Sequence, residues 1–167
     1  PYGVAKAAAF RHVSNYRNSY GLFACSGIMF NHESVLRPSR FVTKKICQSA
    51  ARIALGEISS LKLGDIQIKR DWGWAPEYVQ AMWAILQQKK AEDFVIATGA
   101  IYGLNDFIKY AFLSLNLNWE KYVISNPKLF RPSEIRSGYG SPLKANKKLA
   151  WKASKFMPEV AEKMTLY

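Results

Sequence analysis

Residues 22–30 read Leu-Phe-Ala-Cys-Ser-Gly-Ile-Met-Phe and form a nine-residue, largely apolar run. Apolar and polar residues do not alternate along it, which predicts a strand covered on both faces, as in a parallel sheet. Helical patterns flank this run at residues 4–19 and 42–55, and each is followed by a glycine, Gly21 or Gly56, that can end a helix. A buried strand between two amphipathic helices is typical of α/β proteins.

The same alternation of extended and helical patterns continues to residue 167. Pro76 stands at a first-turn position and predicts the start of a helix. The expected segments are short extended pieces at 59–70, a helix at 76–88, a strand at 93–97, a helix at 104–115, an extended piece at 122–124 within a loop-rich stretch at 118–140, and helices near 143–149 and 157–164. The fold class predicted from this pattern is α/β.

Length and composition exclude several classes of protein. The chain has 167 residues, which suits one ordinary domain, and 49% apolar with 22% charged residues excludes a disordered or collagen-like chain. Its apolar runs are too short to span a bilayer. The 24 basic and 12 acidic residues leave a net charge of +12. Nucleic-acid binding, a pocket for a polyanionic small ligand and a merely basic surface all remain open explanations of that charge.

The cysteines and histidines argue against a metal site. Cys25 and Cys47 stand apart with no CxxC motif, and the only histidines are His12 and His32, so no zinc site is expected. Cys25 lies in the apolar run and is expected to be a reduced core thiol. The chain opens at Pro1 directly on a helical pattern without the features of a signal peptide, so we expect a cytoplasmic location.

Tyr2 and Lys6 are four positions apart on the first predicted helix and therefore share one face. An ammonium group one turn away stabilises a tyrosine phenolate, and such a pair can act as an acid/base on an alcohol or carbonyl oxygen. The alternative is a surface tyrosine beside a solvated lysine.

Polar and basic side chains follow the apolar run. Ligands of open α/β sheets bind beyond the carboxyl ends of strands, so Asn31, His32 and their neighbours through Ser34 are either substrate contacts or a polar turn. The basic residues around the second helix could bind phosphate or form a solvated face. They are Arg37, Arg40, Lys44, Lys45, Lys69 and Arg70.

Arg131 and Glu134 flank Pro132 and Ser133 in a predicted loop. An arginine and a glutamate at this spacing could clamp a charged ligand. They could also form a local ion pair, which contributes well under about 1 kcal/mol at a surface.

Taken together, these segments resemble the GDP-mannose 4,6-dehydratases of the extended short-chain dehydrogenase/reductase superfamily. The resemblance runs from residue 1 to the C-terminus, and its most specific parts are RFVTKKI, KRDWG and FRPSE. The matching segments are PYGVAKAAA (1–9), GIMFNHES (27–34), RPSRFVTKKI (37–46), LGDIQIKRDWGWAPEYVQAMW (63–83), FVIATG (94–99), KLFRPSEI (128–135) and SPLKANKKLAW (141–151).

The resemblance implies a reaction and a set of roles. Members of the family convert GDP-mannose to GDP-4-keto-6-deoxymannose with a bound NADP that is regenerated in each turnover. Tyr2 is then expected to take the proton of the C4 hydroxyl, and Lys6 to hold the nicotinamide ribose and favour the Tyr2 phenolate. His32 and Arg37 match residues that contact NADP. The positions that match contacts to the GDP-sugar are Asn31, Val42, Lys45, Arg70, Arg131 and Glu134.

The resemblance also implies an incomplete enzyme. The family's glycine-rich NADP loop and its Thr/Ser–Glu pair are expected before residue 1. The implied fold is α/β, with residues 1–35 ending an NAD(P)-binding Rossmann-type domain and residues 36–167 forming most of a smaller α/β substrate-binding domain. The loop at 37–41 is expected near subunit contacts, so a homo-oligomer, dimer or tetramer, is implied.

Two other functions stay open at this point. One is an epimerase or reductase acting on another nucleotide sugar. The other is a non-catalytic remnant that keeps the fold of the substrate domain and binds a partner chain. Nucleic-acid binding is disfavoured, because the chain has no platform of aromatic and basic residues.

Overall fold

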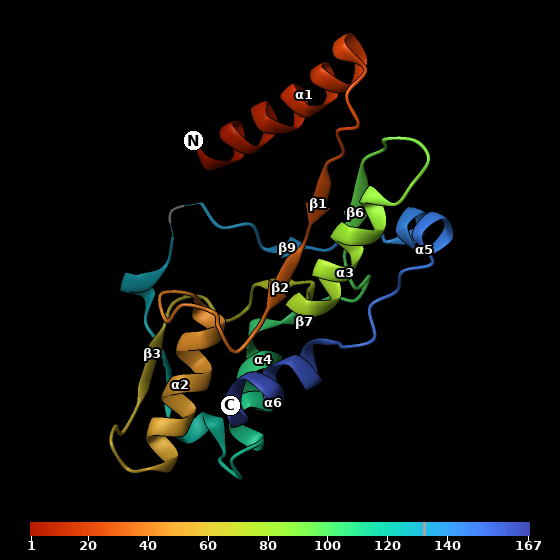
Figure 1. Ribbon diagram of the computed structural model, residues 1–167. Coiled ribbons are helices and arrows are strands. Elements are labelled where there is room, and N and C mark those ends of the chain that lie inside the picture. Colours follow the sequence, from red (N-terminus) through yellow and green to blue (C-terminus); the bar gives the residue numbers. More distant parts are fainter. Residues whose placement is uncertain (132) are drawn as a thin grey trace.

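The structure is a computed structural model that describes residues 1–131 and 133–167 (Figure 1). Its α-helices are α1 (Tyr2–Tyr20), α2 (Val42–Ala54), α3 (Ala75–Leu86), α4 (Leu104–Leu113), α5 (Leu143–Leu149) and α6 (Met157–Leu166). Its strands are β1 (Gly27–Met29), β2 (Asn31–Glu33), β3 (Leu61–Leu63), β4 (Lys69–Arg70), β5 (Trp72–Trp74), β6 (Phe94–Ile96), β7 (Tyr102–Gly103), β8 (Val123–Ser125) and β9 (Ser137–Gly138). Two short 3-10 helices, η1 (Trp119–Lys121) and η2 (Pro127–Leu129), flank β8.

The strands pair over short stretches and mostly in parallel. β1 pairs with β6, β2 with β5 and β3 with β8, all parallel. β4 lies between β7, its antiparallel neighbour, and β9, its parallel neighbour. Parallel pairs connected through helices confirm the predicted α/β class.

The helices bury their apolar faces in two separate groups of residues. In the larger group, α2, α4 and α6 pack on one another and against Trp72 of β5 and the leucines of β3. In the smaller group, α3 and α5 pack on β6, and Tyr78, Phe94 and Trp151 lie at its centre. Burial of these side chains supplies most of the driving force for folding.

Asp71 joins the two groups. It is fully buried between β4 and β5, and its carboxylate accepts hydrogen bonds from the Thr98 N–H (2.9 Å), the Thr98 hydroxyl (2.7 Å) and the Gly99 N–H (2.9 Å), just after β6. Its own N–H donates to the Gly138 carbonyl of β9. One side chain therefore fixes the end of β6 to the β7–β4–β9 sheet.

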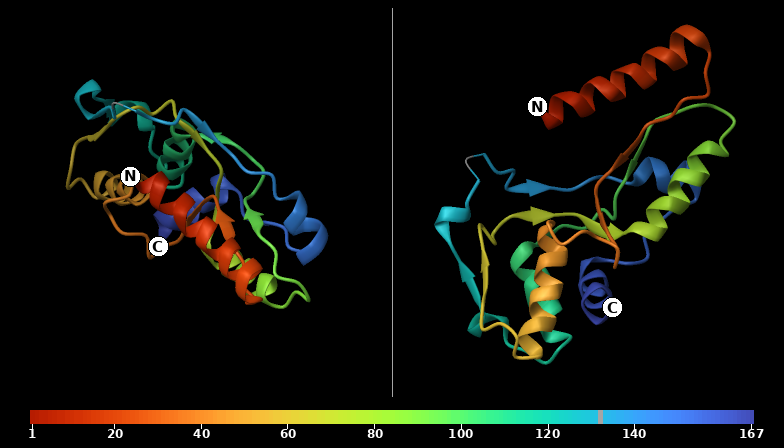
Figure 2. Two further views of the ribbon diagram at one scale, coloured as in Figure 1. Left: turned by 90° about the horizontal axis from the view of Figure 1, so that it is seen from above. Right: turned by 60° about the vertical axis from the view of Figure 1, so that its left-hand side comes forward.

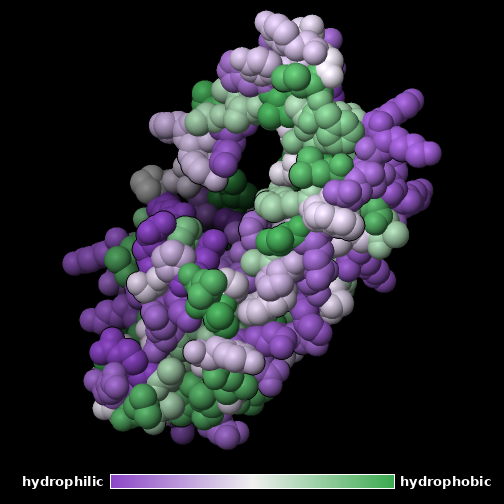
Figure 3. Space-filling view, in the orientation of Figure 1, coloured by the Kyte–Doolittle hydropathy of each residue, from purple (hydrophilic) through white to green (hydrophobic). Residues whose placement is uncertain are grey.

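α1 stands apart from the rest of the molecule. It buries none of its residues, and in the three ribbon views its backbone joins β1 through residues 21–26 and lies apart from the other helices (Figures 1 and 2). The space-filling view shows an opening between α1 and the remainder of the chain (Figure 3). Gly21, at φ 65°, ends the helix in the left-handed conformation, as its position in the sequence predicted.

The helices expected from periodicity are confirmed, with ends that differ by no more than two residues. The strand expected over 22–30 is wrong in extent and in cover, because only Gly27–Met29 is a strand, and Gly27 and Ile28 are exposed. Within the described residues β6 is the one partner strand of β1, so the other edge of β1 is unpaired. The alternative of a polar turn from Asn31 to Ser34 is also wrong, since Asn31–Glu33 forms β2.

We predict that Asp71→Asn lowers the free energy of unfolding by about 1–3 kcal/mol, because an amide cannot accept all three hydrogen bonds and leaves a buried N–H facing a donor. Chemical denaturation of both proteins measures the difference, with the exposed Glu162→Gln as the matched control. Equal stability of Asp71→Asn and the unsubstituted chain would contradict this role of Asp71.

Candidate functional site

Tyr2 and Lys6 lie on one face of α1, as predicted. The Lys6 ammonium is 5.7 Å from the centre of the Tyr2 ring, and both side chains are exposed. No hydrogen bond or ion pair joins either residue to the other predicted site residues within the described part of the chain. The pair is therefore assembled by the helix alone.

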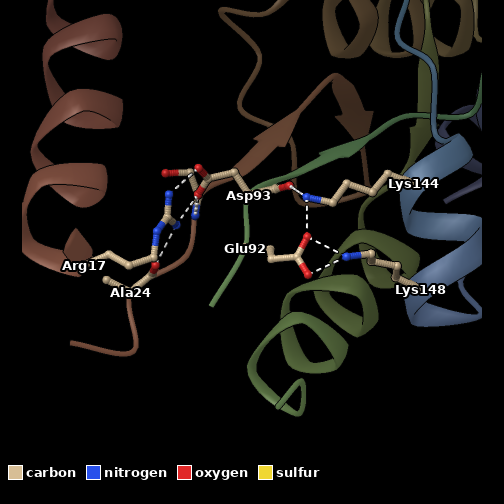
Figure 4. Close-up of polar contacts among 7 residues, drawn as sticks. Arg17, Ala24, Glu92, Asp93, Lys144 and Lys148 are labelled. Atoms are coloured by element: carbon tan, nitrogen blue, oxygen red, sulfur yellow. Dashed lines mark hydrogen bonds and ion pairs between the residues drawn. The ribbon is translucent and has the colours of Figure 1, made fainter. Parts of the chain in front are cut away.

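The position of α1 depends on one ion pair (Figure 4). Arg17 donates two hydrogen bonds to the Asp93 carboxylate, at 2.8 and 2.7 Å, and a third to the Ala24 carbonyl at 2.9 Å. Asp93 also accepts from the Ser26 N–H at 2.8 Å. This arrangement ties the last turn of α1 and the segment that follows it to the start of β6.

A second ionic cluster lies beside the first. Glu92 pairs with Lys144 (2.8 Å) and Lys148 of α5, and these partners lower the pKa of Glu92 to about 2, Lys144 most strongly (Figure 4). Lys144 also donates to the Asp93 carbonyl at 2.8 Å. The segment before β6 is thus held from α1 on one side and from α5 on the other.

Asn31 and His32 occupy β2, which follows β1 after the single residue Phe30. Asn31 is exposed and pairs in register with Trp72, two residues beyond Arg70. The His32 ring is half-buried, and its Nδ1 lies 2.8 Å from the Phe30 carbonyl. β2 therefore brings two of the predicted ligand contacts beside the segment that holds Arg70.

Glu33 ends β2 and is buried, with its carboxylate beside Arg37 and Thr43. Arg37 Nε lies 3.1 Å from Glu33 Oε2, within ion-pair range, although the two atoms are not aligned for a hydrogen bond. Burial raises the pKa of Glu33, and Arg37 and Thr43 oppose that shift. The Arg37 guanidinium also lies over the Phe41 ring, 3.8 Å from its centre, so it is held between a carboxylate and an aromatic face.

Val42 and Lys45 lie in the first turn of α2. Val42 is the first helical residue and is partly exposed, and Lys45 donates from Nζ to the Lys62 carbonyl at 3.0 Å. Both side chains are thus placed at the N-terminus of a 13-residue helix, where unpaired backbone N–H groups favour anions.

Arg70 and Arg131, 61 positions apart, converge on Glu134. Arg70 donates from Nη2 to Glu134 Oε1 at 2.8 Å, and Arg131 Nε lies 3.8 Å from Glu134 Oε2. The Arg70 side chain is 16% exposed, whereas that of Arg131 is 79% exposed. Of the two cations, Arg70 is therefore the pre-organised one.

Several residues that shape this region were missed by the sequence analysis. Asp71 was quoted within KRDWG but given no role, although a lone carboxylate beside Arg70 and Trp72 was a usable signal. Gly73 and Tyr78 were missed as well, because their contacts join residues distant in the sequence. Cys25 is a free thiol as expected, and it is half-buried and packs against the smaller buried group.

Neither a metal site nor a membrane-spanning helix is found in the part of the chain that the structure describes. Within residues 1–131 and 133–167, no three His, Cys, Asp or Glu side chains gather as a metal site would require. No helix in those same ranges combines the length and apolarity needed to cross a membrane.

Comparison with known proteins gives close relatives over almost the whole chain. A family model described as GDP-mannose 4,6 dehydratase matches residues 1–164. The chain is 46% identical over 152 residues to GDP-mannose 4,6 dehydratase 2 of Arabidopsis thaliana, covering 91% of this chain and 41% of that protein. It is 40% identical over 181 residues to GDP-mannose 4,6 dehydratase of Homo sapiens, covering 98% and 49%. The chain thus spans about half the length of the curated relatives it matches.

Solved structures share the fold at low sequence identity. RMD from Pseudomonas aeruginosa complexed with NADPH superposes with a TM-score of 0.88 at 20% identity, covering 99% of this chain and 54% of that one. The dTDP-glucose 4,6-dehydratase of Bacillus anthracis in complex with NAD superposes with a TM-score of 0.84 at 15% identity, covering 99% and 51%. These likenesses establish the architecture.

The tether of α1 should depend on pH. The hydrogen bonds from Arg17 hold the pKa of Asp93 below its ordinary value, against the opposing effect of partial burial. Because this pKa is lowered, the stabilisation of the tether by Asp93 is complete at pH values above the ordinary carboxyl pKa of about 4. It is lost as the pH falls through the lowered pKa and the carboxylate becomes protonated. We expect the Ser26 amide proton signal in NMR spectra to report this step, and Asp93→Asn to abolish it. A step of unchanged size in Asp93→Asn would contradict the assignment.

Proposed function

The chain belongs to the GDP-mannose 4,6-dehydratase family, and from this premise we propose that the complete protein is a lyase that converts GDP-mannose to GDP-4-keto-6-deoxymannose. The convergence of Arg70 and Arg131 on one carboxylate carries the proposal for this chain, because two cations meet where an anionic ligand would be held.

The substrate side is proposed from six residues. Arg70 and Arg131 hold the diphosphate of GDP-mannose through charge-assisted hydrogen bonds, and Glu134 accepts hydrogen bonds from hydroxyl groups. The α2 N-terminus adds Val42 and Lys45 on one side of that site, and Asn31 adds an amide from β2. The contact of Glu134 with Arg70 places the carboxylate and the first cation 2.8 Å apart before any ligand arrives.

The cofactor side is proposed from Lys6, His32 and Arg37. These residues fit an anionic dinucleotide such as NADP: Lys6 is an exposed ammonium, and Arg37 is a cation held between Glu33 and Phe41. His32 Nε2 has no hydrogen-bond partner among the described residues. When bound, NADP would accept a hydride from the sugar and return it to the sugar within the same turnover.

Tyr2 is proposed as the residue that accepts the proton of the C4 hydroxyl. A phenolate accepts a proton readily, and the Lys6 ammonium lies 5.7 Å from the centre of the Tyr2 ring, on the same face of α1. Lys6 also donates to hydroxyl groups of the nicotinamide ribose. Because both residues lie on one exposed face of α1, a sugar and a ribose can approach the pair together.

We further propose that residues 1–35 belong to the cofactor-binding domain and that 36–167 form most of the substrate domain. Supporting observations are the absence of any buried residue in α1, the opening beneath it and the single partner strand of β1 among the described residues. Three elements from residues 36–167 would also belong to the cofactor-binding domain, because they pack on β1 or on one another. They are β6, α3 and α5. We also propose that the complete protein is a homo-oligomer, either a dimer or a tetramer. A cytoplasmic location is proposed as well, and the two free thiols support it.

The isolated 167-residue chain should form no 4-keto-6-deoxy sugar from GDP-mannose and NADP. The elimination needs an acid/base at C5 and a loop that holds the cofactor pyrophosphate, and neither is provided by the proposed residues. Product analysis by mass spectrometry tests this, with the chain joined to an upstream cofactor-binding half as the positive control. Product from the isolated chain would overturn the division of roles, and a different sugar product from the joined protein would favour an epimerase or reductase.

Tyr2→Phe should lower the turnover of the joined protein by about 100-fold or more, because it removes only the acid/base hydroxyl. Substrate affinity should barely change. Tyr20→Phe, an exposed tyrosine at the other end of α1, is the matched control. Near-normal turnover of Tyr2→Phe would show that the Tyr2–Lys6 spacing is a coincidence.

Arg70→Ala should weaken GDP binding to the joined protein by about 10- to 150-fold, the equivalent of one charge-assisted contact of about 1.5–3 kcal/mol. Arg131→Ala should weaken it less, by about 2- to 5-fold, because an exposed, solvated cation contributes less. Both effects should shrink as salt rises. Calorimetry measures the affinities, with Arg52→Ala in α2 as the control. Unchanged GDP affinity in both variants would show that these cations form a solvated face.

A further inference from the structure

His32 is held in one tautomer by its own strand connection. Its Nδ1 lies 2.8 Å from the Phe30 carbonyl, and a carbonyl oxygen can only accept a hydrogen bond. In the neutral ring, Nδ1 must therefore carry the proton and donate, which leaves a lone pair on Nε2. No described residue forms a hydrogen bond with that lone pair.

Tyr78 of α3 holds the plane of the same ring. The two ring centres are 4.7 Å apart and the planes are inclined by 25°, which is a stacked arrangement. Tyr78 is fully buried, and Trp151 packs edge-on against its ring at 5.7 Å and 86°. Because this packing holds the Tyr78 ring in place, it also restricts rotation of the His32 ring that stacks on it.

Gly73 makes room for this stack. It lies opposite His32 in the β2–β5 pairing, and a Cβ atom there would come within 2.4 Å of Tyr78 Cε2. The Tyr78 ring therefore lies directly against the backbone of β5. β2, β5 and α3 each contribute one constraint on the position of the imidazole.

The Tyr78 hydroxyl takes no part in the contact. It is buried and has no hydrogen-bond partner within the described residues, so the flat ring alone carries the interaction with His32. Tyr78→Phe consequently keeps the stack, and it is the matched control for any substitution that removes it.

We propose that Tyr78 is a positioning residue that holds His32 as the Nδ1–H tautomer, so that Nε2 accepts a hydrogen bond from a hydroxyl or amide N–H of the bound dinucleotide. The proposal rests on the proposed function, in which His32 contacts NADP. It adds the direction of the hydrogen bond and the residue that enforces it.

The tautomer can be read directly from long-range 1H–15N NMR spectra of the 167-residue chain. His12, exposed on α1 with no hydrogen-bond partner in the described ranges, is the only other histidine and serves as an internal reference. We expect His32 to show a single Nδ1–H tautomer in the unsubstituted chain and in Tyr78→Phe. Tyr78→Leu should give signals averaged between tautomers, with His12 unchanged.

A single Nδ1–H tautomer retained in Tyr78→Leu, or an Nε2–H tautomer in the unsubstituted chain, would overturn the proposal. If Tyr78→Leu does not fold, Tyr78→Met fills the space with a flexible side chain that has no flat face. The spectrum of the unsubstituted chain tests the tautomer without any variant.

NADPH affinity separates this proposal from the proposed function. In the joined protein with its cofactor-binding half, fluorescence titration should show affinity weakened by about 3- to 10-fold in Tyr78→Leu, as expected for one lost hydrogen bond. Tyr78→Phe should bind as the unsubstituted protein does, and His32→Ala should add no further loss to Tyr78→Leu. If Tyr78→Leu shows averaged tautomers but unchanged NADPH affinity, His32 does not accept a hydrogen bond from the cofactor. The role of Tyr78 in fixing the tautomer would then still stand.

Discussion

A single buried carboxylate, that of Asp71, connects the parts of this molecule that carry the proposed site. Its oxygens accept three hydrogen bonds from Thr98 and Gly99 after β6, and its backbone N–H pairs with β9. A buried charge is stable only when such donors surround it. Because Arg70 directly precedes Asp71, the constraint that joins the two packed regions also places the less exposed of the two cations.

The neighbouring contacts depend on the same strand. Trp72 follows Asp71, pairs with Asn31 of β2 and packs in the larger core. The positions of β2 and of the helices in that core therefore both depend on β5. Gly73 then admits the Tyr78 ring that stacks on His32. Three consecutive residues therefore set the anion-binding side, the core and the histidine side of the proposed site.

The cations behind the net charge of +12 occupy two kinds of position in this structure. Several of the cations lie against carboxylates at the joints of the fold: Arg17 on Asp93, Arg37 on Glu33 and Arg70 on Glu134. Lys6 and Arg131 stay exposed on separate elements, α1 and the loop after η2. This pattern fits a large anionic ligand held between elements better than it fits a continuous basic surface for nucleic acid.

The sequence predicted the longer helices well because apolar residues recur along them at helical spacing. β2, β5, β7 and β9 were not predicted, since a strand of two or three residues has no periodicity to read. The apolar run at 22–30 predicted a covered strand, but only Gly27–Met29 is a strand, and Gly27 and Ile28 are exposed. The nearness of Arg70 and Arg131 followed from the family resemblance alone, and the roles of Asp71 and Tyr78 depend on contacts 20 or more positions apart that no local pattern encodes.

The most direct test is a crystal structure of the joined protein, carrying its cofactor-binding half, with NADP and GDP-mannose bound. The account predicts diphosphate oxygens within about 3 Å of the Arg70 guanidinium and the sugar C4 hydroxyl within hydrogen-bond distance of the Tyr2 hydroxyl. A diphosphate bound away from Arg70, or a sugar that leaves Tyr2 in solvent, would contradict it.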